Sequence, residues 1–216
     1  MKDTFILLPG WTRSIRTYKK LISQAPKNVE IIFVSYSDMS LQDIAIDFPK
    51  ALLNVLNTNG LKKVSIIGHS LGGALALEFA LTYPERINEL YLSGPAGIYG
   101  KETLVNLASN HFRNLIEKKL KVVRAILNGD SLIKKFPSHR RLGKYAHYVD
   151  FTDRLSNLKL KTTFLWGEKD YIHPLWQGEL MHKTTPNSKL IVVKGVGHDW
   201  LVYNPELFWK YLNRQS

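Results

Sequence analysis

The 216-residue sequence contains no cysteine, which excludes disulfides, thiolate nucleophiles and cysteine-ligated metal sites and fits a reducing compartment. It also lacks long hydrophobic runs. The N-terminal apolar run 5–8 ends at Pro9-Gly10 and is too short for a signal peptide, and no segment approaches the roughly 18 apolar residues of a membrane span. We therefore expect a cytoplasmic protein with no membrane span.

Acidic residues are few, with 18 Asp and Glu against 30 Lys and Arg, so the formal net charge is +12. Residues 101–150 hold eleven of the basic and four of the acidic residues, which gives +7 in that window. A solvated basic surface explains this balance, and an anionic partner is the alternative. We expect no nucleic-acid binding, because no recognised nucleic-acid motif accompanies the charge.

Short apolar runs rich in β-branched residues alternate with helical patterns along the chain. Strands are predicted at 4–8, 31–36, 64–67, 90–92, 162–166 and 190–193, and helices at 14–23, 43–56, 71–81, 175–182 and 206–212. This alternation predicts an α/β fold with a parallel sheet covered on both faces. Residues 97–150 interrupt it with helical spacing, so we predict a core of 1–96 and 151–216 and a helical insertion at 97–150.

Ser70 lies in the pattern Gly68-His69-Ser70-Leu71-Gly72, between a predicted strand and a predicted helix. A turn sharp enough to raise a side chain above the sheet favours glycine two positions before and after it. The hydroxyl would then lie at a helix N-terminus, where N–H groups stabilise a developing oxyanion. The pattern favours a nucleophilic serine, and a tight turn that merely contains a serine is the alternative.

An acid and a histidine follow two later strands. Asp170 comes directly after the strand at 162–166, and His198 comes after the strand at 190–193. The carboxyl ends of parallel strands share one edge of the sheet, so both should lie near Ser70. Glu168 precedes Asp170 in the same loop and is an alternative partner for His198.

Four motifs are LLPGW (7–11), GHSLGG (68–73), WGEKD (166–170) and GVGH (195–198). Together they resemble the α/β-hydrolase superfamily over nearly the whole chain. The resemblance implies a reduced α/β-hydrolase fold of about six parallel strands, with residues 97–150 as a small helical cap. It also implies Ser70 as nucleophile, His198 as general base and then acid, and Asp170 as the orienting carboxylate.

The same resemblance implies an oxyanion hole made by the backbone N–H groups of Trp11 and Leu71. Many relatives have His-Gly where this chain has Pro9-Gly10. Proline has no N–H, but the donor belongs to Trp11, so the hole can survive the change.

The remaining acids and histidines receive other predictions. Asp199 is expected to point away from His198 and cap the final helix, and His69 is expected to be packed or hydrogen-bonded away from the nucleophile. His173 is expected at the rim of the site. No metal site or cofactor is predicted, since the other histidines lack ligand spacing: His111, His139, His147 and His182.

A serine nucleophile with a histidine base performs acyl transfer. We therefore predict a serine esterase that cleaves carboxylic esters with short to medium acyl chains through an acyl-enzyme. The predicted substrate-binding residues are Trp11, Ile98, Phe136 and Tyr148, for which simple packing of the cap is the alternative. A thioesterase and a non-catalytic ligand-binding member of the fold are the alternative functions.

The basic insertion suggests one macromolecular partner. Acyl carrier proteins are acidic, and basic surfaces steer such partners. The chain is similar in outline to the pimeloyl-carrier-protein methyl ester esterases, so an ester linked to an acidic acyl carrier protein is a further alternative to a free small-molecule ester. The sequence does not predict an oligomeric state.

Overall fold

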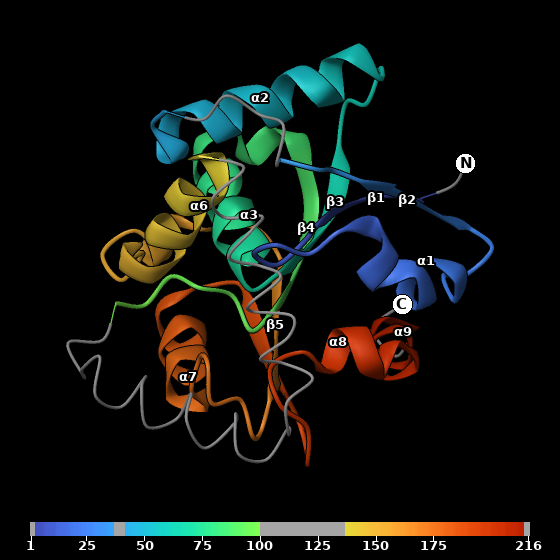
Figure 1. The fold of residues 1–216 in the computed structure, drawn as a ribbon, viewed down its shortest axis with the longest axis vertical. Helices are drawn as coiled ribbons and strands as arrows, with labels where there is room; N and C mark the ends of the chain where they lie inside the picture. Colours follow the sequence, from blue (N-terminus) through green and yellow to red (C-terminus); the bar gives the residue numbers. More distant parts are fainter. Residues whose placement is uncertain (1–2, 37–41, 100–136, 214–216) are drawn as a thin grey trace.

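The computed structural model describes residues 3–36, 42–99 and 137–213 (Figure 1). Six strands form one sheet, in the order β2-β1-β3-β4-β5-β6, and every neighbouring pair is parallel. The strands are β1 (Asp3–Leu8), β2 (Val29–Phe33), β3 (Val64–His69), β4 (Ile87–Ser93), β5 (Thr162–Gly167) and β6 (Ser188–Val193). The predicted α/β fold with six parallel strands is confirmed.

Helices cover both faces of this sheet. One face carries α2 (Ile44–Thr58), α3 (Leu71–Thr82), α6 (Pro137–Tyr148) and α7 (Leu175–Thr184). The other carries η1 (Ile15–Tyr18), α1 (Lys19–Ser23), α8 (Trp200–Tyr203) and α9 (Pro205–Asn213). Short 3-10 turns η2 (Pro84–Arg86) and η3 (Leu155–Asn157) precede β4 and β5.

Alternate residues of β1 show why two layers of helices are needed. Ile6 and Leu8 belong to one hydrophobic cluster, whereas Phe5 and Leu7 belong to the other. Successive side chains of a strand point to opposite faces, so an apolar run is buried only if both faces are covered. The strand therefore reads as a continuous apolar run in the sequence.

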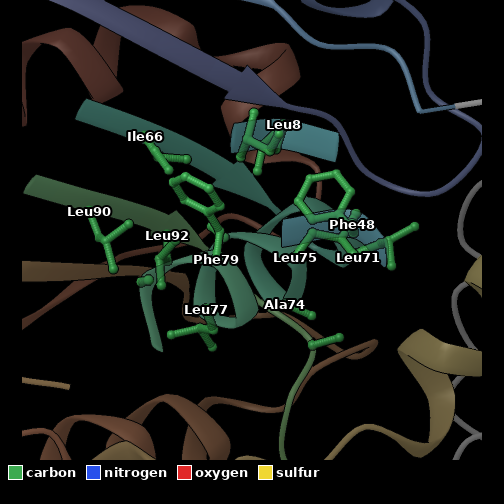
Figure 2. Packing of buried hydrophobic residues seen from close by; sticks show 14 of the residues in the cluster. Leu8, Phe48, Ile66, Leu71, Ala74, Leu75, Leu77, Phe79, Leu90 and Leu92 are labelled. Carbon is green, nitrogen blue, oxygen red and sulfur yellow. The ribbon is translucent and has the colours of Figure 1, made fainter. Parts of the chain in front are cut away.

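Helix α3 runs through the larger cluster. Its residues from Leu71 to Ala80 are all buried, and all of them except Glu78 are apolar, as expected for a helix enclosed by a core. Figure 2 shows Leu75 and Phe79 gathered with Leu8 and Ile66 of the strands and Phe48 of α2. The start of α3, where Ser70 lies, is therefore fixed by a rigid core.

Three sequence predictions differ from the structure in detail. The helix expected at 14–23 is divided into η1 and α1, and β2 ends at Phe33 rather than Tyr36. The short helix α8 was not predicted, because its four residues are too few for a periodic pattern.

Of the predicted insertion, the structure describes residues 97–99 and 137–150. Helix α6 lies against α2 and α3. Tyr145 of α6 donates a hydrogen bond to Glu78 of α3 at 2.8 Å, and Arg154 binds the same carboxylate through two hydrogen bonds. Within the described ranges, no helix is long and apolar enough to cross a bilayer.

Candidate active site

Ser70 occupies a strained turn between β3 and α3. Its backbone angles are φ 55° and ψ −118°, a region that non-glycine residues avoid and that costs on the order of 1–3 kcal/mol. A Cβ atom on Gly68 would lie 2.7 Å from Gly73 Cα, and one on Gly72 would lie 2.1 Å from the Leu8 carbonyl oxygen. These close backbone approaches leave no room for a Cβ atom and explain why glycine is needed two positions before and two positions after Ser70.

Asp170 and His198 are hydrogen-bonded, with 2.7 Å between Asp170 Oδ2 and His198 Nδ1. The two side chains are 1% and 8% exposed. The other carboxylate oxygen of Asp170 accepts the backbone N–H groups of Ile172 and His173, each at 2.9 Å. A carboxylate held in this way fixes the orientation and tautomer of the imidazole.

The electrostatics of this pair favour its charged form. Burial acts against the imidazolium, but the charge and hydrogen bond of Asp170 outweigh it, and the pKa of His198 is raised above 6.5. Burial likewise opposes ionisation of Asp170, yet the neighbouring His198 and His173 lower the pKa of that carboxyl. The carboxylate is therefore ionised at neutral pH, and His198 is well placed to accept a proton.

Backbone contacts bring Ser70 to the same place. The N–H of Ser70 donates to the Ser93 carbonyl at 3.0 Å, where β4 ends. The next residue, Gly94, has φ +49°, and a Cβ atom there would lie 2.9 Å from Asp170 Oδ2 and 3.2 Å from His198 Nδ1. The ends of β3, β4 and β5 and the loop after β6 thus meet at one edge of the sheet, as predicted.

Two further histidines flank His198. The ring centroid of His69 lies 5.2 Å from that of His198, and His173 meets His198 edge to face at 4.9 Å. His173 Nδ1 donates to the Gly94 carbonyl at 2.8 Å. Burial, aided by repulsion from His198, lowers the pKa of both flanking histidines to about 4, so both are neutral near pH 7.

No sequence pattern indicates this contact of His173. A rim position was expected, but the turn after β5 folds back and places the ring against His198. His69 is packed and hydrogen-bonded, as expected, through Tyr18.

The two residues predicted as oxyanion donors belong to segments next to Ser70. Leu71 is the first residue of α3, where a backbone N–H has no acceptor in its own helix. The Trp11 loop is close because a Cβ atom on Gly10 would lie 3.5 Å from Ser70 Cβ. The Trp11 indole donates to the His139 carbonyl of α6 at 2.9 Å, and the side chain is 39% exposed.

Glu168 and Asp199 have partners other than the His198 ring. Glu168 accepts the N–H of Gly195 at 2.8 Å, so Asp170 is the acid in contact with His198. Asp199 precedes α8 but makes no capping hydrogen bond through its side chain, which instead pairs with Arg13 at 2.8 Å. The expectation that Asp199 caps a helix with its side chain is therefore wrong.

The predicted pocket residues that the structure describes differ in their surroundings. Ile98 is buried, and its carbonyl accepts a hydrogen bond from Gln177 at 3.4 Å. Tyr148 is exposed, with its ring against those of Tyr99 and His147. Phe136 lies outside the described residues. Among residues 3–36, 42–99 and 137–213, no three His, Asp or Glu side chains are grouped so that they could hold a metal ion.

Comparison with known proteins agrees with the observed fold. A protein-family model described as "alpha/beta hydrolase fold" matches residues 5–144. A 2-hydroxy-6-oxo-6-phenylhexa-2,4-dienoate hydrolase from Burkholderia cepacia is 28% identical over 174 residues, which cover 69% of this chain and 61% of the relative. The match thus spans less than two thirds of that protein.

A second relative is aligned over more of its length. A 2-hydroxy-6-oxononadienedioate/2-hydroxy-6-oxononatrienedioate hydrolase from Paraburkholderia phymatum is 25% identical, over 91% of this chain and 81% of the relative. Among solved structures, an alpha/beta hydrolase enzyme from a sediment metagenome of the Mar Chica lagoon, Morocco, has a TM-score of 0.76 at 21% identity. That alignment covers 100% of this chain and 90% of the other, and it shows a shared fold.

Proposed function

Because this chain belongs to the alpha/beta hydrolase fold family, we propose that it is a serine hydrolase in which Ser70, His198 and Asp170 act as one unit. The hydrogen bond of 2.7 Å between Asp170 and His198 carries this proposal. It lies at the edge of the sheet where the strained Ser70 turn begins α3. A base oriented by an acid beside a projecting hydroxyl is the arrangement that nucleophilic catalysis needs.

The proposed reaction has two halves. Ser70 Oγ attacks the carbonyl carbon of an ester while His198 Nε2 takes its proton, and the N–H groups of Trp11 and Leu71 stabilise the oxyanion. The bond to the alcohol oxygen then breaks, and His198 gives its proton to the leaving alcohol. Water attacks the acyl-enzyme in the same way, which releases the acid and restores Ser70.

The proposed substrates are carboxylic esters with short to medium acyl chains. We propose that residues 97–150 form a cap over the site, with α6 as its described helix. The contact of the Trp11 indole with α6 supports this arrangement, because it joins the cap to the loop beside Ser70. Trp11, Ile98, Phe136 and Tyr148 remain the proposed acyl-binding residues.

Cleavage of a carbon–carbon bond is the second candidate. The relatives described above are named as hydrolases of 2-hydroxy-6-oxo compounds, which contain a ketone and a carboxylate but no ester, so their hydrolysis breaks a carbon–carbon bond. Attack on their ketone carbonyl needs the same base and oxyanion donors, but the leaving group is a carbon that must be protonated.

An ester carried by an acidic acyl carrier protein is a further alternative substrate. Such a partner would bind the exposed basic residues of α6, which include Arg140, Arg141 and Lys144.

A substrate panel tests these proposals. We expect turnover of p-nitrophenyl esters from acetate to octanoate and a loss on the order of 10³-fold or more in Ser70→Ala. Ser65→Ala, a buried serine of β3 away from the turn, is the matched control and should retain activity. Faster turnover of a 2-hydroxy-6-oxo-dienoate would favour the second candidate, and no Ser70-dependent turnover of any substrate would contradict a serine hydrolase.

A further inference from the structure

A buried hydrogen-bond chain joins the loop of the proposed oxyanion donor to the loop of the proposed base. The Gly10 N–H donates to Tyr18 Oη at 2.8 Å, and Tyr18 Oη lies 2.7 Å from His69 Nδ1. His69 Nε2 lies 3.4 Å from the His198 carbonyl oxygen. Tyr18 and His69 are almost wholly buried, so water does not compete for these groups.

The direction of each hydrogen bond follows from the donors present. Gly10 N–H can only donate, so Tyr18 Oη accepts there and its own proton is available for His69 Nδ1. Burial raises the pKa of Tyr18, which therefore keeps that proton. His69 Nδ1 is then the acceptor and Nε2 carries the hydrogen, directed at the His198 carbonyl.

Arg13 and Asp199 close the chain into a ring. Asp199 directly follows His198 in the chain, and its Oδ2 pairs with Arg13 at 2.8 Å. The Arg13 N–H returns to the Gly10 carbonyl at 3.0 Å. The Gly10–Arg13 turn, which includes Trp11, is therefore held from both ends against the loop that carries His198.

We propose that Tyr18 and His69 are positioning residues, which fix the Trp11 N–H and the His198 main chain relative to Ser70 through this ring. The inference rests on the proposed function. Neither side chain needs to touch the substrate, because the ring acts through Gly10 and His198. Pro9 is held separately, since its carbonyl accepts a hydrogen bond from Tyr36.

Tyr18→Phe is the central variant, since it removes one oxygen from the middle of the chain. Loss of a whole oxyanion donor lowers kcat on the order of 10²–10³-fold, so a displaced donor should lower it by about 10-fold. KM should stay within about twofold, because ground-state binding does not use the ring. Tyr91→Phe is the matched control: it also removes one hydrogen-bonded tyrosine hydroxyl, which in this case donates to Glu89, and it should leave kcat unchanged.

His69→Asn separates the two halves of the ring. The shorter amide can still accept near the Nδ1 position but cannot reach the His198 carbonyl. We expect it to lower kcat as Tyr18→Phe does, with the double variant no worse than the more impaired single one. Fully additive losses, or an unchanged kcat in Tyr18→Phe, would overturn the proposal.

Nitrogen-15 NMR of histidine-labelled protein provides a readout that does not depend on catalysis or on a variant that folds. The wild-type spectrum should show His69 neutral near pH 7, with hydrogen on Nε2 and none on Nδ1. Hydrogen on Nδ1 would overturn the proposed ring even if the enzyme is active. Conversely, the expected tautomer in a protein without Ser70-dependent turnover would refute the proposed function and leave the ring intact.

Discussion

Helix α3 has a buried polar cluster near each end, and the two clusters differ in whether all their polar side-chain atoms are hydrogen-bonded. Around Glu78, the carboxylate accepts two hydrogen bonds from Arg154 and one from Tyr145, at 2.7–3.0 Å. Around His198, Asp170 is equally well paired, with three N–H donors. Within the described part of the chain, however, no hydrogen bond engages His198 Nε2 or Ser70 Oγ.

This difference fits the proposed function, in which the Glu78 cluster is structural and the His198 cluster is catalytic. The Glu78 cluster joins α3 to α6 and to the segment before β5, and its pairing is complete. The His198 cluster combines a strained serine, an oriented base and two flanking neutral histidines. Substitutions at the first cluster should therefore lower stability, whereas substitutions at the second should lower activity.

Asp170→Asn should have the largest effect. The amide can hold His198 in the wrong tautomer, so kcat for an ester substrate should fall on the order of 10³–10⁴-fold. Steady-state kinetics measures the loss of activity, and thermal unfolding followed by circular dichroism measures any loss of stability. A loss of folded protein in proportion to the lost activity would place Asp170 among the structural residues instead.

Glu78→Gln should have the opposite effect, with lower stability and nearly unchanged activity. The change removes the charge that pairs with Arg154, whose side chain is 44% exposed and can turn toward water. We expect a loss of about 2–3 kcal/mol in the free energy of unfolding, measured by urea titration. The kcat of the folded fraction should remain within about threefold of the wild-type value. A large decrease in kcat in fully folded protein would contradict the distinction between the Glu78 cluster and the His198 cluster.

Tyr145→Phe tests the same cluster more gently. It removes one hydrogen bond to Glu78 and leaves the ion pair with Arg154 in place. The unfolding free energy should drop by about 1 kcal/mol, and the effect should be smaller in a Glu78→Gln background because the two residues share one network. Equal effects in both backgrounds would show that the Tyr145 hydroxyl stabilises the protein independently of the Glu78 carboxylate.

The pH profile should show the smallest effect. His198 must be neutral to accept the Ser70 proton. Burial and Arg13 lower its pKa, but the charge and hydrogen bond of Asp170, together with the charge of Asp199, outweigh them and raise it overall. The acid limb of kcat/KM should therefore have its midpoint above 6.5, with activity gained as pH rises through it. In Asp170→Asn the residual activity should have a lower midpoint, and an unmoved midpoint would mean that another group titrates.

The sequence predicted the strands and the main helices because each is buried on a defined face. Apolar runs such as Ile66–Ile67 in β3 have no other stable environment, and Gly68 and Gly72 mark a turn that few other sequences fit. The positions of Ser70, Asp170 and His198 followed from the parallel sheet. These features depend on local pattern and on the order of elements.

The remaining features depend on contacts between distant loops. Arg13 pairs with Asp199, 186 positions away, and Tyr18 reaches His69 across 51 positions. His173 contacts His198 only because the turn after β5 folds back. No spacing rule encodes such contacts, so the expected cap by Asp199 was wrong and the ring through Tyr18 was not foreseen.

The most direct measurement is the site and rate of labelling by a fluorophosphonate, with the adduct located by mass spectrometry of peptides. The account predicts one adduct, on Ser70, that forms much more slowly in Asp170→Asn. An adduct on a different residue, no adduct at all, or equal labelling of Ser70 in the two proteins would contradict it.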